Sequence, residues 1–176
     1  ALNHNKLVAT VMSNTGLFDA LDKVGIEYEK TTVGDRFVYE CMQNNSYTLG
    51  GEQSGHIILK KYATTGDGLL TAIMIAEEIC DTKTSLASLA APVRLYPQYV
   101  KNIRVKDKAA VLSDSEVLAA KKKVEELIGG KGRALLRQSG TEPVIRVMIE
   151  AKTQEKCEEY ADIISNVIIE RGHSVE

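Results

Sequence analysis

The sequence predicts a two-domain α/β protein. The expected architecture is a mixed α/β/α sheet domain followed by an α+β domain of β-α-β-β-α order, with its helices on one face of the sheet. Three observations predict it. The first half opens with a strand, a helix and a strand in about 27 residues, a βαβ unit that favours parallel strands. The second half has two adjacent strand-like runs before a final amphipathic helix. Between them, Pro92 and Pro97 are two of the chain's three prolines.

The elements of the first half follow from apolar spacing and from turn residues. Residues 6–12 suit a buried strand, residues 17–24 have helical spacing up to Gly25, and residues 26–32 suit a second strand. The later expected elements are a helix with Phe37, Val38, Cys41 and Met42 on one face, strands at 47–49 and 56–59, an apolar helix from Leu69 to about Ile79, and a short helix at 85–91. Residues 1–91 therefore form the predicted first domain, followed by a linker at 92–98.

The second half, residues 99–176, forms the predicted α+β domain. Residues 99–106 alternate like a strand, and Ser113 and Glu116 have the spacing of a capping box. The helix that follows is expected to end at Gly129. Its inner face is expected to hold Val117, Val124, Leu127 and Ile128. Strands are expected at 132–137 and 144–150. Thr153 can cap a last helix whose inner face holds Cys157, Tyr160, Ala161, Ile164, Val167 and Ile168.

Composition excludes several classes of protein. Twenty-two basic and 24 acidic residues give a net charge of −2, and aromatic residues make up only 5%. Affinity for nucleic acid through a basic surface or an aromatic platform is therefore not expected. No apolar run approaches the ~20 residues that a membrane span needs, and no leader is recognisable. Cys41, Cys80 and Cys157 are widely spaced, which favours buried thiols over disulfides or a zinc site, in a reducing cytoplasm.

Residues 137–143, which read RQSGTEP, are dense in groups that bind anions. Arg137 offers a planar fork that matches phosphate, and Arg146 could add a second guanidinium from the paired strand. Ser139 and Thr141 offer hydroxyl groups, and Gly140 permits a close backbone approach and a positive φ. A polar hairpin turn with local Ser and Thr hydrogen bonds explains the same residues, and both interpretations remain open.

Residues 50–56, which read GGEQSGH, suggest a loop whose backbone approaches a ligand. Glu52, Gln53 and Ser54 can hydrogen-bond sugar hydroxyl or amino groups. The imidazole of His56 can move a proton to or from a sugar oxygen. The alternative is a glycine-rich hairpin with a satisfied histidine.

The remaining polar motifs are weaker. Asp35 and Arg36 open a helix, either as a ligand loop or as a cap with a surface ion pair. Residues 65–67 suit a helix cap, and the lysines at 121–123 suit a solvated helix face. No closely spaced aspartates suggest a Mg²⁺ loop, and no serine has an activating base. The chain offers binding groups without a complete catalytic set.

Taken together, residues 50–56 and 137–143 resemble the α-D-phosphohexomutase superfamily. Residues 10–17 (TVMSNTGL), 33–38 (VGDRFV) and 64–68 (TTGDG) fit the same family in the same order. The resemblance covers essentially the whole chain, but only the third and fourth of the family's four domains. It also implies a third domain without its opening helix.

The residues of these motifs are similar to those of the family's amino-sugar branch. That resemblance implies a cytoplasmic isomerase that interconverts glucosamine 6-phosphate and glucosamine 1-phosphate, on the route to UDP-N-acetylglucosamine and cell wall. A phosphoserine and Mg²⁺, both expected in missing N-terminal domains, would work through a 1,6-bisphosphate. This chain alone would then be inactive.

The resemblance also assigns roles to residues of this chain. It implies phosphate binding by Arg137, Ser139, Gly140, Thr141 and Arg146, substrate contacts by Glu52, Ser54, Asp35 and Arg36, and proton transfer by His56. The expected partners are a phosphosugar and the missing domains, with no nucleic acid, membrane or metal bound by this chain. The alternatives are a phosphomannomutase or phosphoglucomutase fragment, a non-catalytic phosphosugar-binding module, and an interaction module.

Overall fold

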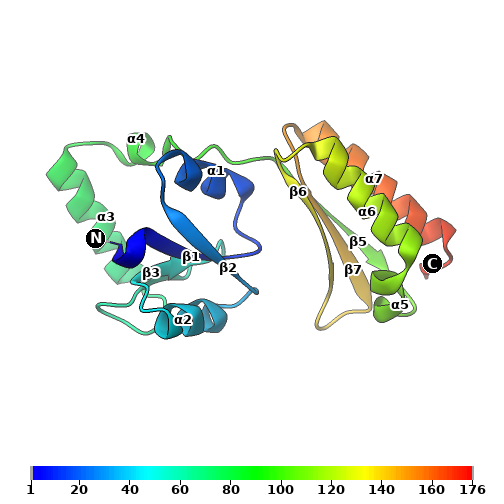
Figure 1. Cartoon of the computed structure of the whole chain (residues 1–176), viewed down its shortest axis with the longest axis horizontal. Coiled ribbons are helices and arrows are strands. Elements are labelled where there is room, and N and C mark those ends of the chain that lie inside the picture. Colours follow the sequence, from blue (N-terminus) through cyan, green and yellow to red (C-terminus); the bar gives the residue numbers. More distant parts are fainter. Residues whose placement is uncertain (1, 176) are drawn as a thin grey trace. The chain divides into compact units, whose positions relative to one another are not determined.

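The computed structural model describes residues 2–175 (Figure 1). The chain divides between Leu95 and Tyr96 into two compact units, each with its own sheet. None of the helices in the described part is long and apolar enough to cross a membrane.

The first unit is built on a four-stranded mixed sheet of order β2-β1-β3-β4. Its elements are η1 (Asn3–Asn5), β1 (Lys6–Thr10), α1 (Thr15–Lys23), β2 (Glu27–Thr31), α2 (Asp35–Asn44), β3 (Leu49–Gly51), β4 (Ile57–Leu59), α3 (Gly68–Thr82) and α4 (Leu86–Ala90). Strand β1 pairs in parallel with β2 and with β3, whereas β3 and β4 are antiparallel. The predicted parallel βαβ unit and the mixed sheet are therefore confirmed.

Helix α2 covers one face of this sheet. Val38 and Met42, one helical turn apart, are fully buried against Val8 and Ile58. A Cβ at position 50 would lie 2.6 Å from the Met42 Sδ atom, so Gly50 in β3 lets the helix approach closely. The prediction that Phe37 faces inward is wrong, because Phe37 is adjacent to Val38 on the helix and is 45% exposed.

The opposite face of the sheet is less covered. An apolar groove of about 390 Å³ lies there, and its walls include Leu7, Leu17, Leu49, Ile57, Val93 and Leu95. Helix α3, which is adjacent to β4, has no buried residue, and Leu69 at its start is 81% exposed. The buried thiol predicted for Cys80 is wrong for this reason: no described element covers that side of α3. The prediction is confirmed for Cys157, which is buried, whereas Cys41 is only half-buried; burial raises the pKa of both thiols.

The second unit is a three-stranded antiparallel sheet of order β5-β7-β6 with its helices on one face (Figure 1). Its elements are β5 (Gln98–Arg104), α5 (Lys108–Ser113), α6 (Ser115–Ile128), β6 (Arg133–Gln138), β7 (Val144–Glu150) and α7 (Gln154–Glu170). Alternate residues of β7, namely Ile145, Val147 and Ile149, pack against Val124 and Ile164 of the helices. The predicted α+β order is confirmed, with the short helix α5 added before α6.

Two details of this unit differ from expectation. The residue that caps α6 is Asp114 rather than Ser113, because the Asp114 carboxylate accepts the amide N–H groups of Glu116 (2.8 Å) and Val117 (3.4 Å). Leu127 is about half exposed, since Val124 and Ile128 already form the inner face. The predicted cap by Thr153 is confirmed by its bond from the Lys156 amide.

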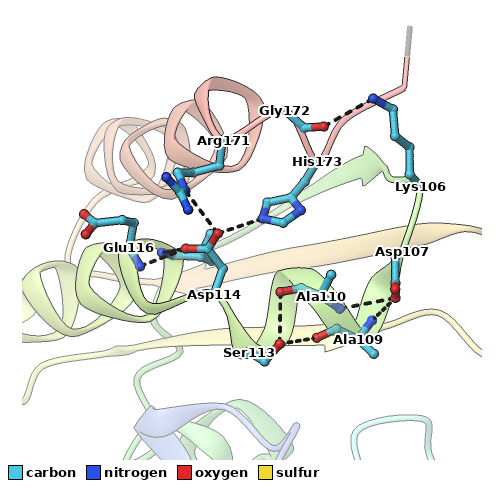
Figure 2. Close-up of polar contacts among 11 residues, drawn as sticks. Lys106, Asp107, Ala109, Ala110, Ser113, Asp114, Glu116, Arg171, Gly172 and His173 are labelled. Carbon is cyan, nitrogen blue, oxygen red and sulfur yellow. Dashed lines mark hydrogen bonds and ion pairs between the residues drawn. The ribbon is translucent and has the colours of Figure 1, made fainter.

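Asp114 also fastens the C-terminal segment (Figure 2). Its Oδ2 atom lies 2.9 Å from His173 Nε2 and accepts a hydrogen bond from Arg171 Nε at 3.1 Å. The His173 contact, assisted by Arg171 and the two cap amides, holds the pKa of this carboxyl well below its ordinary value. Beyond His173, a bridge from Val105 to Ser174 places the segment beside β5.

Candidate functional site

The loop between β6 and β7, residues 139–143, is a closed turn. The Ser139 amide donates to the Val144 carbonyl (3.0 Å), and the Glu142 amide donates to the Ser139 hydroxyl (3.3 Å). Ser139 itself is buried. The loop is therefore held by its own ends, which leaves its middle exposed.

Gly140 and Thr141 form that exposed middle. Within residues 2–175, neither amide N–H has a hydrogen-bond partner, and both residues are open to solvent. The φ angle of Gly140 is outside the positive range, and a Cβ there would meet nothing within 4 Å. The backbone thus does not require glycine here, and a side chain at this position would project into space that a ligand could use.

Two arginines stand on the strands that flank this loop. Arg137 on β6 and Arg146 on β7 are direct cross-strand partners, on the sheet face opposite the helices. Like charges in such a position destabilise a sheet unless something neutralises them. Glu142 does so in part, at 3.6 Å from Arg146 Nη2, while the buried Arg146 Nε has no partner among the described residues. Two cations and two free amides make this end of the hairpin suited to an anion.

Lys108, which no sequence motif predicts as a site residue, also contacts this loop. Its ammonium donates to the carbonyl of Ser139 at 2.8 Å and to that of Glu142 at 3.3 Å. Lys108 begins α5, a helix too short for apolar periodicity to reveal, and it is 31 residues from Ser139 along the chain.

In the first unit, the loop between β3 and β4 brings together the other candidate residues. A tight turn closes at residues 52–56, with Gly55 at a φ of +98° that favours glycine. The side chain of Glu52 is only 8% exposed. Its Oε2 accepts the Gly34 amide at 3.1 Å, and its Oε1 accepts the Ser54 hydroxyl at 2.5 Å.

Ser54 connects this buried carboxylate to His56, whose Nδ1 lies 2.9 Å from the Ser54 oxygen. A carboxylate only accepts hydrogen bonds, so the single hydroxyl proton of Ser54 is committed to Glu52. The Ser54 oxygen must then accept from His56, which places a proton on Nδ1. In the neutral imidazole, Nε2 is left as a proton acceptor on a half-exposed ring.

Two further motifs of the first unit meet at this loop. The Gly34 amide that binds Glu52 belongs to the segment with Asp35 and Arg36. A Cβ at Gly66 would lie 3.1 Å from atoms of His56, so residues 65–67 pack closely on the histidine. Asp67 caps α3 through the Leu70 amide, as predicted for a plain cap.

The side chains of Asp35 and Arg36 have partners on their own helix. Asp35 Oδ1 accepts the Arg36 amide at 2.8 Å, and Arg36 Nε donates to Glu40 at 2.7 Å. The Arg36 side chain is 80% exposed. Their contact with a substrate stays a prediction.

No group of three or more His, Cys, Asp or Glu side chains that could hold a metal ion occurs in the described part of the chain.

Comparison with known proteins identifies relatives of both units. Residues 1–96 match the family described as phosphoglucomutase/phosphomannomutase, alpha/beta/alpha domain III, and residues 101–167 match the C-terminal domain of that family. The phosphoglucosamine mutase of Lachnospira eligens is 56% identical over 171 residues, which are 97% of this chain and 38% of the relative. That of Oceanobacillus iheyensis is 51% identical over 167 residues, 95% of this chain and 37% of the relative. This chain therefore spans well under half the length of these relatives.

Solved structures show the same fold. An N-acetylphosphoglucosamine mutase from Aspergillus fumigatus has a TM-score of 0.81 at 16% identity, over 95% of this chain and 38% of that one. The same enzyme in complex with GlcNAc-6P and magnesium has a TM-score of 0.76 at 14% identity, over 95% of this chain and 39% of that one.

Proposed function

The chain belongs to the phosphoglucomutase/phosphomannomutase family, and from this we propose that it is the C-terminal part of a phosphoglucosamine mutase. The whole enzyme would interconvert glucosamine 6-phosphate and glucosamine 1-phosphate. A phosphoserine in the part of the relatives that this chain does not span would donate its phosphoryl group to form a 1,6-bisphosphate. After the intermediate reorients, the other phosphoryl group would return to the serine.

The observation that carries this proposal is the pair of facing arginines beside two free loop amides. In the two half-reactions, the phosphate that does not react is on different carbons of the sugar. A site that serves both must bind phosphate without reading the sugar attached to it. Arg137, Arg146 and the amides of Gly140 and Thr141 meet that requirement, and charge-assisted bonds contribute about 1.5–3 kcal/mol each. Ser139 would support them by closing the loop.

The loop at residues 52–56 would bind the sugar and transfer the proton of its hydroxyl group. Nε2 of His56 can take a proton from the attacking sugar hydroxyl and return it in the reverse step. Glu52 holds Ser54 and the Gly34 amide in place, and Asp35 and Arg36 would contact the sugar from the adjoining segment. Phosphoryl transfer depends mainly on such positioning and on electrostatic stabilisation.

Magnesium enters this proposal only through the whole enzyme. The metal would stabilise charge on the transferring phosphoryl group, with ligands from the part of the relatives that lies outside this chain. Since residues 2–175 hold no suitable cluster, no step is assigned to a metal bound by this chain.

A titration tests the phosphate site directly. Amide NMR spectra of the 176-residue chain are recorded with inorganic phosphate, glucosamine 1-phosphate and glucosamine. We expect phosphate to shift the Gly140 and Thr141 amides with a Kd on the order of 1 mM, equivalent to about −4 kcal/mol. Arg137→Met and Arg146→Met should weaken binding at least tenfold, or about 1.4 kcal/mol. Lys101→Met, a control on the same sheet whose ammonium donates to Asp162 of α7 at 2.6 Å, should not. Loop amides that ignore all three ligands would contradict the proposal.

A chimera tests the reaction. This chain replaces the aligned C-terminal region of the Lachnospira eligens phosphoglucosamine mutase. We expect the chimera to turn over glucosamine 6-phosphate, and the 176-residue chain alone to show no turnover. A chimera that prefers glucose or mannose phosphates would favour a phosphoglucomutase or phosphomannomutase instead.

A further inference from the structure

Lys108 is tied to the most anion-suited segment of the molecule. Its ammonium bonds the carbonyls of Ser139 and Glu142, the two residues that flank Gly140 and Thr141. A long, flexible side chain loses rotamer freedom when it is held by two carbonyls at once. This double contact therefore singles out Lys108 from the lysines that point into solvent.

The contact fixes the direction of a peptide unit. The Ser139 carbonyl and the Gly140 N–H belong to one planar trans peptide, so they point in opposite directions. When Lys108 holds the carbonyl, the Gly140 N–H is turned away from the lysine and into the open side of the loop. The Glu142 carbonyl belongs to the peptide bond before Pro143, and proline has no N–H. The hydrogen bond from Lys108 to this carbonyl therefore anchors the far end of the loop and orients no further N–H group.

Charge acts in the same direction. Lys108 belongs to α5, on the helix-covered face of the sheet, whereas Arg137 and Arg146 lie on the opposite face. A cation bonded to a carbonyl also polarises the N–H of the same peptide. Glu142, which is paired with Arg146, opposes this positive field. The positive charge of Lys108, which bonds the Glu142 carbonyl, offsets the negative charge of the Glu142 carboxylate.

We propose that Lys108 is a positioning residue for phosphate: it holds residues 139–142 so that the Gly140 and Thr141 amides face the anion. This inference rests on the proposed function, which assigns the loop to the phosphate of the substrate. Nothing in it requires Lys108 to touch the ligand.

The test compares three variants of the 176-residue chain. Lys108→Met removes the bonds and the charge but keeps the side-chain stem, and Lys108→Arg keeps both donors and charge. Lys106→Met is the matched control, because Lys106 also donates to a carbonyl, that of Gly172 at 3.4 Å, but on the C-terminal segment (Figure 2). The readouts are the Kd for inorganic phosphate and the exchange rates of the Ser139 and Glu142 amides, both hydrogen-bonded within the loop.

We expect Lys108→Met to raise the phosphate Kd at least fivefold relative to Lys106→Met and to speed exchange of the two loop amides. Lys108→Arg should restore both values. If exchange quickens while the Kd matches the control, Lys108 only stabilises the hairpin and the proposal is wrong. If neither changes, it is wrong as well. Should Lys108→Met fail to fold, as judged by the α7 amides, Lys108→Gln takes its place.

Failure of the proposed function gives a different result. The wild-type chain would then show no response to phosphate at all, before any variant is compared. That outcome would mean that the loop binds no phosphate, and it overturns both proposals. A wild-type response that Lys108→Met leaves unchanged overturns only the role of Lys108.

Discussion

One hydroxyl group decides which nitrogen of His56 carries the proton. The Glu52 carboxylate is buried and takes the only proton that Ser54 can donate, so the Ser54 oxygen must accept from His56 Nδ1. These two hydrogen bonds join three residues of the motif Glu-Gln-Ser-Gly-His and orient the imidazole of His56. Glu52 therefore acts on His56 mainly through Ser54, and its Oε1 also lies 3.5 Å from His56 Nδ1.

The tautomer of His56 is open to measurement. In the neutral ring, we expect the Nδ1–H form to dominate, as read from side-chain ¹⁵N shifts. Ser54→Ala should lower its share, because the nearest acceptor of the Nδ1 proton is removed and only Glu52 Oε1, 3.5 Å from Nδ1, is left. Ser88→Ala, which alters a serine on α4, serves as the control. A dominant Nε2–H form in the wild-type chain would show that the hydrogen bonds run in the other direction.

The elements of the fold were largely predictable, because both units bury periodic apolar faces. Residues 117, 124 and 128 of α6 and the inner face of α7 follow the helical spacing that predicts them. The cap of α6 was missed, because Ser113, Asp114 and Ser115 can all cap a helix and only the packing of His173 and Arg171 on Asp114 selects one. Lys108 was missed because its contact joins two elements far apart in the sequence.

Two glycines should behave oppositely when each is replaced by alanine. At Gly50 the added Cβ would crowd Met42 and Val38 in the core under α2, which should cost about 1–3 kcal/mol of stability. At Gly140 it would meet nothing, so stability should change by less than about 0.5 kcal/mol. Urea unfolding of both variants measures the difference. A loss of stability at Gly50 as small as that at Gly140 would mean that α2 lies farther from β3 than the structure places it.

The Asp114 cluster predicts a dependence of stability on pH. Its folded-state pKa lies below the ordinary value of 3.8, so protonation costs the folded state more than the unfolded state. The stabilisation is fully present above about pH 4 and is lost as the pH falls toward the folded-state pKa. Asp114→Asn keeps a capping side chain but removes the charge. We expect its urea midpoint to lie below that of the wild type at pH 7, and the gap to narrow between pH 4 and pH 2.5. A constant gap over that range would argue against the cluster.

The whole molecule contains two units with unequal cores. In the second unit, apolar residues from three helices and three strands form one continuous cluster, whereas the core of the first is a small cluster beneath α2. Helix α3 and the groove beside Leu7 and Leu49 leave much apolar surface uncovered. Since local stability follows buried apolar contact, the two units should open at different free energies.

Hydrogen exchange on the 176-residue chain tests this asymmetry. We expect amides of β7 and α7 to exchange slowest, because Ile145, Ile149 and Ile164 are fully buried around them. Amides of α3 should exchange fastest among the long helices, since none of its residues is buried. Repeating the measurement at several protein concentrations controls for self-association. If α3 is protected as strongly as α7 at every concentration, its apolar face is covered within the monomer, and the expected asymmetry between the two units is wrong.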